Sequence, residues 1–459
     1  MIDSFRNIAA IPELRKRIFF TFAMLAVYRI GCNIPVPGVD PAALVEVMEQ
    51  ARQTMLGFLN TFTGGSIERA AIFALGIMPY ITASIILQLL TVVVPYLEKL
   101  SKEGELGRRK ITQYTRYGTL LVSLIQSTGI AFAVERISTP GGLSLVPDPG
   151  WGFRLMTILT LTTGCAFVMW LGEQISERGI GNGISLIIFA GIVIGLPGAI
   201  ASTWQKVQTG ELSPIIIVPG LIFMAAVTAF IVYMERSQRR IPVQYAKRVV
   251  GRKVYGGQNT YLPLRVNTGG VIPVIFASSV VMVFPTLAQL TTWEPMQRLS
   301  DILSMGEPIY YVLLISTIIF FTYFYVSIIF NPQDTAENMR KYGGFIPGIR
   351  SGRRTAEYID RILTRLTLIG SVYLAVVSAL PEIMLVGFKV GNIPFIGETL
   401  DQYVPQWIIN GVGIDFYFGG TSLLIIVGVA MDFVQQVESQ LVMRNYDGFL
   451  KKGRVRGRR

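Results

Sequence analysis

The sequence predicts an all-α polytopic membrane protein with ten transmembrane helices. Three observations lead to this prediction: a high apolar content, repeated apolar stretches of about 20 residues, and basic residues confined to alternate gaps between these stretches. Of the 459 residues, 51% are hydrophobic and only 15% are charged, and the mean hydropathy is +0.50. This composition excludes an ordinary soluble protein of the same length.

Ten stretches are long and apolar enough to cross a bilayer. A helix rises about 1.5 Å per residue, so roughly 20 apolar residues cross about 30 Å of hydrocarbon. The first stretch follows Arg15, Lys16 and Arg17 as a signal peptide would, but no small-residue cleavage site comes after it, so we expect it to be retained. The predicted spans are residues 18–34, 76–96, 117–134, 153–172, 184–200, 214–233, 269–290, 309–330, 366–387 and 416–437.

The basic residues indicate the orientation of these spans. All but eight of the 41 Lys and Arg residues fall in alternate gaps or at the two ends, which the positive-inside rule places in the cytoplasm. The same rule explains most of the net charge of +12 without a nucleic-acid partner. The eight exceptions are Arg29, Arg52, Arg69, Arg136, Arg154, Lys206, Arg298 and Lys389.

The span count divides the chain into two halves, residues 1–205 and 206–459. Because five is odd, the second set of five spans enters from the side opposite to the first, and such inverted halves build a central pathway at their interface. No convincing sequence repeat relates the halves, so their symmetry is inferred from the count.

Three gaps are longer than a turn requires. Residues 60–75 contain a glycine pair and then about ten mostly apolar residues, too few to cross, which favours a re-entrant or half-inserted helix. Residues 235–267 carry eight basic residues, and Glu235 is their only acidic residue. Residues 331–365 contain FIPGIRSGRR, in which the Pro-Gly pair favours a turn that presents Arg350 to solvent. We expect the last two gaps to project into the cytoplasm.

The usual signs of an enzyme or a cofactor site are missing from the sequence. The chain has no histidine, which excludes Ser-His-Asp and Cys-His nucleophiles and histidine metal sites. It has no phosphate-binding GxxxxGK[ST] motif, and GIGNG at residues 179–183 lacks the spacing of a dinucleotide loop. Its two cysteines, Cys32 and Cys165, have no metal-ligand spacing. We therefore expect no catalytic residue, metal or cofactor.

Ionisable residues lie toward the ends of the predicted spans, and the span centres are apolar. The residues in question are Arg29, Arg154, Glu173, Glu382 and Asp432. A secondary transporter with five plus five spans needs such groups near the midplane, and an intramembrane enzyme needs a catalytic pair there. An apolar midplane is instead typical of a hydrophobic constriction. Both alternatives stay open but are disfavoured.

Two isoleucine pairs stand at the starts of spans. Ile77 and Ile81 share one helical face because they are four residues apart, and Ile184 and Ile188 repeat that spacing. From the residues alone, packing or lipid contact explains these pairs more readily than a pore does.

The chain resembles the SecY family, the channel-forming subunit of the bacterial Sec protein translocon, over essentially its whole length. The resemblance rests on seven blocks in the family's order: GGSIERAAIFALGIMPYITASIILQLL from Gly64, KEGELGRRKITQYTRYGTL from Lys102, WLGEQISERGIGNGIS from Trp170, QRRIPVQYAKR from Gln238, LPLRVNTGGVIPVIFASS from Leu262, FNPQDTAENMRKYGGFIPGIR from Phe330 and FYFGGTSLL from Phe416.

The resemblance implies a central hourglass pore between the halves, closed at its waist by an aliphatic ring and on the outer side by a plug. A narrow apolar ring dewets when it is empty, yet it can close around any passing polypeptide. By motif matching, the ring is Ile77, Ile81, Ile184, Ile188, Ile275 and Ile425. The plug is a short helix at about residues 64–75, which includes Gly64, Gly65, Ser66, Ile67, Glu68, Arg69, Ala70, Ala71, Ile72 and Phe73.

The resemblance also implies a lateral gate, where the second and third spans part from the seventh and eighth. Thr82, Ser84, Gln88 and Asn267 are polar residues suited to this seam, although ordinary helix packing explains them equally well.

The resemblance further implies an external motor, either the ATPase SecA or the translating ribosome. The contact candidates in the two long basic gaps are Arg252, Lys253 and Arg350, which also suit the phosphates of ribosomal RNA. Further expected partners are SecE, SecG, secretory and membrane-protein precursors and the lipid bilayer, and the expected location is the bacterial inner membrane with both termini in the cytoplasm.

The sequence departs from the family at two places. Ser351 follows PGIR where the family usually has proline, and we expect a looser loop tip there. Residues 388–414 are longer than the link typical of many bacterial members, and the sequence assigns no role to this outer segment.

Overall fold

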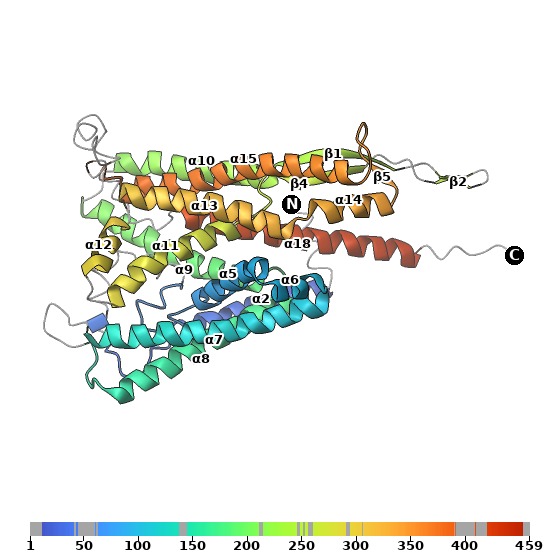
Figure 1. Cartoon of the computed structure of the whole chain (residues 1–459). Coiled ribbons are helices and arrows are strands. Elements are labelled where there is room, and N and C mark those ends of the chain that lie inside the picture. Colours follow the sequence, from blue (N-terminus) through green and yellow to red (C-terminus); the bar gives the residue numbers. More distant parts are fainter. Residues whose placement is uncertain are drawn as a thin grey trace.

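The structure is a computed structural model, and it is mostly helical. Figure 1 shows the order of its elements. The described residues are 12–40, 43–44, 60, 63–136, 145–210, 214–245, 248–250, 253–255, 260–290, 294–304, 306–389, 391, 409 and 420–452. The helices are α2 (Pro12–Gly31), α5 (Met78–Val93), α6 (Pro95–Lys102), α7 (Glu105–Arg136), α8 (Trp151–Arg178), α9 (Gly183–Gln208), α10 (Pro214–Arg236), α11 (Ile272–Leu290), α12 (Glu294–Ile302), α13 (Pro308–Ile329), α14 (Pro332–Lys341), α15 (Arg353–Val386) and α18 (Gly420–Lys452).

Each of the ten predicted spans overlaps one of these helices. Within the described part of the chain, seven helices are long and apolar enough to cross a membrane, and α5 with α6 forms one more candidate that is bent by 99°. The bend falls at Val94, which is extended (φ −96°, ψ 111°) because the following Pro95 disfavours helical geometry there. The prediction of a multi-pass helical membrane protein is confirmed, while the number of ten spans stays a prediction.

The helices of the first and second halves of the chain gather on opposite sides of the molecule. In Figure 1, α2, α5, α7 and α8 lie below, whereas α10, α13 and α15 lie above. The two groups meet along two seams, because α11 packs against α5 and α7, and α9 packs against α18. The inverted symmetry of the halves stays a prediction.

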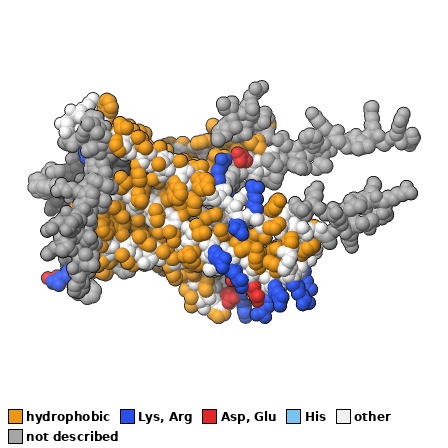
Figure 2. Space-filling view, turned by 90° about the horizontal axis from the view of Figure 1, so that it is seen from above, with side chains coloured by type: hydrophobic (Ala, Val, Ile, Leu, Met, Phe, Trp, Pro, Cys, Tyr) orange, Lys and Arg blue, Asp and Glu red, His pale blue; other side chains and the backbone are white. Residues whose placement is uncertain are grey.

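Apolar side chains cover the middle of the molecular surface. Leu121 on α7 and Ile222 on α10 are among many large apolar side chains that remain exposed. Figure 2 shows hydrophobic atoms over the middle of one face, and Lys and Arg gathered toward the end where α14 lies in Figure 1. An apolar band beside a basic end suits a protein embedded in lipid with one side facing the cytoplasm.

A small sheet joins the two long basic gaps. Strand β1 (Gln238–Tyr245) pairs antiparallel with β4 (Thr260–Arg265) on one side and with β5 (Gly344–Phe345) on the other, and β2 (Arg248–Val250) pairs with β3 (Lys253–Tyr255). Ile241 and Val243 alternate with exposed residues in β1 and pack with Ile359 of α15 in one apolar cluster. The sequence analysis did not predict this sheet, although the alternation in β1 was a visible signal.

An ion pair joins α7 and α8 at one end of the bundle. The distance from Arg154 Nε to Glu135 Oε2 is 2.6 Å, and the Arg154 guanidinium lies over the rings of Phe132 and Trp151 at 4.5 Å and 5.2 Å. The two side chains are only 24% and 11% exposed, which strengthens the interaction relative to a surface pair.

We expect Arg154→Ala to lower the free energy of unfolding by about 1.5–3 kcal/mol, because the buried Glu135 loses a charged hydrogen-bond partner. Thermal unfolding of the purified protein in detergent measures this loss. Arg109→Ala is the control, since Arg109 pairs with Glu105 on the exposed face of α7 and should cost less than about 0.5 kcal/mol. Equal shifts in the two variants would contradict the prediction.

Candidate pore and its closing segment

The six isoleucines of the expected ring belong to one large apolar cluster or pack against it. Ile77 caps the start of α5 and Ile81 lies in its first turn, Ile184 and Ile188 come from the start of α9, Ile275 from α11 and Ile425 from α18. All of them except Ile184 are at most 6% exposed and belong to one apolar cluster, and Ile184 is partly buried against it. The cluster thus contains isoleucines from both halves of the chain.

The start of α9 is held in place by close backbone packing. The Asn182 side chain accepts a hydrogen bond from the amide of Ile184 (3.1 Å) and caps the helix. A Cβ added to Gly183 would lie 1.9 Å from the carbonyl oxygen of Gly172 on α8, so only glycine permits this approach. These contacts set the position of Ile184 and Ile188.

The apolar cluster extends beyond the predicted ring. Ile85 and Ile192 lie one turn further along α5 and α9 than Ile81 and Ile188, and both are buried in the same cluster. Sequence reasoning missed them, although the spacing of four residues continues through both.

Residues 63–77, called here the closing segment, form consecutive turns. The prediction of a short helix at residues 64–75 is therefore wrong. Gly64, Gly65 and Gly76 have φ values of 69°, 79° and 53°, and Ala70 has 42°, whereas an α-helix needs negative φ throughout. The segment instead bonds to the chain after α2: the Val36 amide donates to Ala70 O (2.8 Å), and the Ile72 amide donates to Ile34 O (2.9 Å).

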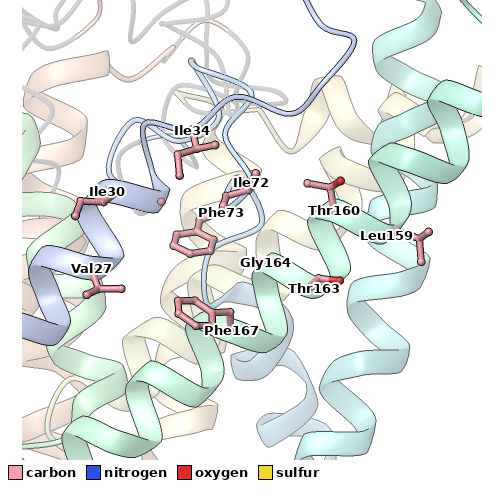
Figure 3. A pocket seen from close by; sticks show the side chains of 11 residues that line it. Val27, Ile30, Ile34, Ile72, Phe73, Leu159, Thr160, Thr163, Gly164 and Phe167 are labelled. Atoms are coloured by element: carbon pink, nitrogen blue, oxygen red, sulfur yellow. The ribbon is translucent and has the colours of Figure 1, made fainter.

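Two glycines on neighbouring helices make room for the closing segment. A Cβ added to Gly31 of α2 would lie 1.9 Å from the ring of Phe73, and one added to Gly164 of α8 would lie 2.0 Å from Ile72 O. We call this pair the glycine notch. Figure 3 shows Phe73 between the two helices, and this ring is buried in the main cluster. The sequence analysis assigned no role to either glycine.

The α2 helix holds the beginning of the closing segment through polar contacts. Tyr28 Oη donates to Thr63 O (3.3 Å), and Arg29 Nη1 donates to Gly64 O (2.9 Å). Phe73 also stacks on Tyr28 with ring centroids 6.0 Å apart. The segment is thus fixed at both ends against the same helix.

The four polar residues expected at the lateral gate make hydrogen bonds within α5 or to α10. Thr82 Oγ1 donates to Met78 O (3.1 Å) and Gln88 Nε2 to Ser84 Oγ (3.2 Å), all within α5. Asn267 Nδ2 donates to Glu235 Oε1 of α10 (2.6 Å). Gln88 Oε1 and Asn267 Oδ1 are buried without a hydrogen-bond partner among the described residues.

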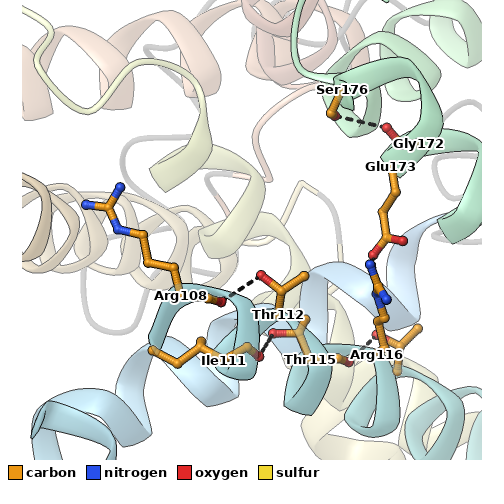
Figure 4. A network of polar contacts seen from close by, with 9 residues as sticks. Arg108, Ile111, Thr112, Thr115, Arg116, Gly172, Glu173 and Ser176 are labelled. Atoms are coloured by element: carbon orange, nitrogen blue, oxygen red, sulfur yellow. Dashed lines mark hydrogen bonds and ion pairs between the residues drawn. The ribbon is translucent and has the colours of Figure 1, made fainter. Parts of the chain in front are cut away.

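The charged residues near the span ends all have structural partners. Figure 4 shows Arg116 of α7 beside Glu173 of α8, and these side chains are 2.7 Å apart. Arg29 and Arg154 have the partners given above. Tyr310 Oη donates to Glu382 (2.9 Å), and Asp432 lies 3.7 Å from Arg265. The second oxygen of Glu382, Oε2, is buried without a hydrogen-bond partner among the described residues.

The candidate contact residues of the basic loops are only partly described. Arg350 is exposed and follows a turn in which Gly348 has φ 80°. Its carbonyl oxygen accepts a hydrogen bond from Thr355 Oγ1 (3.0 Å), and Ser351 beside it is exposed. Arg252 and the side chain of Lys253 lie outside the described residues, as does most of the segment 388–414.

Comparisons with known proteins agree on one family. The SecY family model matches residues 71–434. The chain is 49% identical to the protein translocase subunit SecY of Escherichia coli K12, over 97% of this chain and 96% of that protein. It is 47% identical to the same subunit of Vibrio cholerae, over 98% and 96% of the two chains.

Solved structures agree on the fold. A structure described as a protein-conducting channel has a TM-score of 0.62 and 18% identity, covering 92% of this chain and 91% of that one. Sec61 from the canine ribosome-channel complex has a TM-score of 0.58 and 18% identity over the same shares. Family match, near-full-length identity and shared fold together show that this chain belongs to the SecY family.

Proposed function

We propose that this chain is a passive protein-conducting channel. It passes unfolded secretory polypeptides across the membrane and releases apolar segments sideways into lipid. The observation that carries this proposal is the burial of isoleucines from both halves of the chain in one apolar cluster. A narrow apolar constriction excludes ions by dewetting, and it tolerates any polypeptide because it offers no selective hydrogen bonds.

The closing segment serves as the plug of the resting channel. It packs Phe73 into the same cluster as the ring, so it must move before a polypeptide passes. The seam of α11 against α5 and α7 supplies the lateral exit. A sufficiently apolar segment enters lipid there without catalysis, because its transfer into hydrocarbon is favourable.

An external motor supplies directional movement, either the ATPase SecA or the translating ribosome. One structural neighbour is described as part of a ribosome-channel complex, which supports the ribosome as a partner of this family's fold. We infer that the motor docks on the sheet of the basic loops, with Arg252, Lys253 and Arg350 as contacts. SecE and SecG are the proposed membrane partners, and the basic end faces the cytoplasm of a bacterial inner membrane.

Site-specific photocrosslinking tests the pore. A photoreactive residue is placed in turn at Ile81, Ile184, Ile275 and Ile425, and a secretory precursor is arrested midway in vesicles that hold the full translocon, SecA and ATP. Val312 on α13, 66% exposed, is the control. Crosslinks from all four ring positions and a silent control support the central pore. Silent ring positions with a demonstrably inserted precursor would rule it out.

We expect Arg350→Glu to weaken motor docking about fivefold, because one basic side chain near an anionic surface contributes roughly 1 kcal/mol. Binding of ribosomes or SecA to the reconstituted channel measures the change, and the difference should shrink at high salt. Arg298→Glu is the control, since Arg298 is also exposed but lies on α12 at the other end of the molecule. An unchanged affinity at low salt would remove Arg350 from the docking surface.

A further inference from the structure

A buried hydrogen bond joins the start of α13 to the end of α15, at the end of the molecule where α12 lies (Figure 1). Tyr310 Oη donates to Glu382 Oε1 over 2.9 Å, and both residues are 3% exposed. Because Glu382 Oε2 has no partner among the described residues, the Tyr310 hydroxyl is the one side-chain donor to this carboxyl group in that part of the chain. A buried carboxyl group is costly without hydrogen bonds, so this donor favours the observed placement of the two helices.

The turn of α15 that carries Glu382 depends on support from outside its own helix. Pro381 lies inside α15 and has no amide hydrogen, so it cannot donate to the carbonyl oxygen of Val377 as another helical residue would. The helix ends at Val386, and the following Gly387 has φ 89°. The last turn therefore lacks one of the backbone bonds that would tie it to the rest of α15, and its contacts with α13 contribute more to its position.

The other contacts at this junction are weaker or lie just beyond α15. Tyr311 Oη is 3.5 Å from Gly387 O, which is long for a bond between a hydroxyl donor and an oxygen acceptor. The Lys389 amide donates to Gly306 O (3.0 Å), after the helix has ended. Lys389 Nζ pairs with Glu307 Oε1 (3.0 Å), but the lysine side chain is 56% exposed, and exposed ion pairs contribute little. The buried tyrosine–glutamate bond is thus the main polar tie between the two helices at this end.

The α13 helix also packs against a helix of the seam between the halves. Phe276 of α11 packs edge-on against Phe321 and Tyr325 of α13, with ring centroids 5.9 Å and 6.0 Å apart. The same α11 helix packs on α5 and α7, where we place the lateral exit. A contact that fixes α13 on α15 therefore limits how easily α11 can leave the seam.

We propose that Tyr310 and Glu382 are positioning residues of the lateral exit. Their hydrogen bond holds α13 on α15, and α13 in turn keeps α11 against α5 and α7 until an apolar segment enters the seam. This inference rests on the channel function proposed above. Without the Tyr310 hydroxyl, α13 and α11 are freer to move, so opening the seam costs less and segments of lower apolarity enter lipid.

A graded series of precursors tests this proposal. Each precursor carries one test segment of about 20 residues with a different number of leucines, and the ratio of laterally released to fully translocated molecules is measured in vesicles that hold the full translocon. Tyr310→Phe should raise this ratio about tenfold for segments of intermediate apolarity. Tenfold corresponds to about 1.4 kcal/mol, within the usual cost of leaving a buried acceptor unpaired.

Tyr311→Phe is the matched control, because it removes the same hydroxyl from the neighbouring residue. Tyr311 is also 3% exposed, but its hydroxyl makes only the long contact given above. This variant should leave the ratio at the wild-type value. An equal ratio in Tyr310→Phe and Tyr311→Phe would overturn the proposal.

A double variant separates positioning from stability. Tyr310→Phe alone leaves the buried carboxyl group unpaired and should lower the unfolding temperature, whereas Tyr310→Phe with Glu382→Leu replaces both partners by apolar groups, which is nearly neutral for stability. We expect the double variant to unfold near the wild-type temperature and still to show the raised ratio, and it decides alone if the single variant fails to fold. A ratio that returns to the wild-type value together with stability would mean that the bond is merely structural. If even the wild type releases no segment sideways at any apolarity, the proposed lateral exit itself is wrong, so the two failures are distinguishable.

Discussion

We expect Gly164→Ala to make the resting channel leak ions. The new Cβ would stand 2.0 Å from the Ile72 carbonyl oxygen, and backbone cannot move aside as a flexible side chain can. The closing segment must therefore shift out of the glycine notch. Overpacking of this kind costs about 1–3 kcal/mol, which raises the population of the displaced segment roughly 5–150-fold. Ion efflux from vesicles that contain the reconstituted channel measures the increase.

Gly152→Ala provides the matched control for this experiment. Gly152 lies on the same helix, and a Cβ added there meets nothing within 4 Å. This variant should show the same low ion efflux as the wild type. If Gly164→Ala folds and its channel does not leak ions, the closing segment does not seal the pore.

The second large effect is a rise in ion conductance, which we expect from Ile188→Asn. Ile188 is 2% exposed and lies in the shared cluster, so an amide there would hydrate the proposed constriction, which aliphatic side chains would keep dry. Removing a desolvation barrier of about 1.4–2.8 kcal/mol, within the usual range for a polar group, raises ion conductance about 10–100-fold. Single-channel recording in planar bilayers measures this conductance.

Ile188→Val separates polarity from size in the same position. It removes one methylene but keeps the ring apolar, and its conductance should stay near that of the wild type. Equal conductance of the valine and asparagine variants would mean that the ring does not act by dewetting.

The helices could be predicted from sequence because a bilayer imposes a minimum apolar length on each span. The six ring isoleucines were named through resemblance, since isoleucines four residues apart are common on any packed or lipid-facing helix. Five of these isoleucines are now found buried in a single cluster, with Ile184 against it, and their role in the pore stays a proposal. Ile85 and Ile192 were missed because the ring was named by resemblance, and the spacing of four residues was not followed further along the two helices.

The conformation of the closing segment could not be predicted from its local sequence. Its run IERAAIFAL has the composition of a helix, and the apolar residues suggested a half-inserted one. Bonds to the backbone of Ile34 and Val36 hold the segment in turns, and those partners lie more than thirty positions earlier in the chain. The glycine notch depends on the same long-range fit, so neither Gly31 nor Gly164 was recognisable from its neighbours in sequence.

The sheet of the basic loops has a mechanical consequence. Strand β1 begins two residues after α10 ends, and β4 ends at Arg265, shortly before α11 begins at Ile272. Asn267, between β4 and α11, is tied to Glu235 at the end of α10. A force on the sheet would therefore act on α10 and α11 together. Because α11 packs against α5 and α7, a load on the sheet would be transmitted to the seam between the halves, where the proposed lateral exit lies.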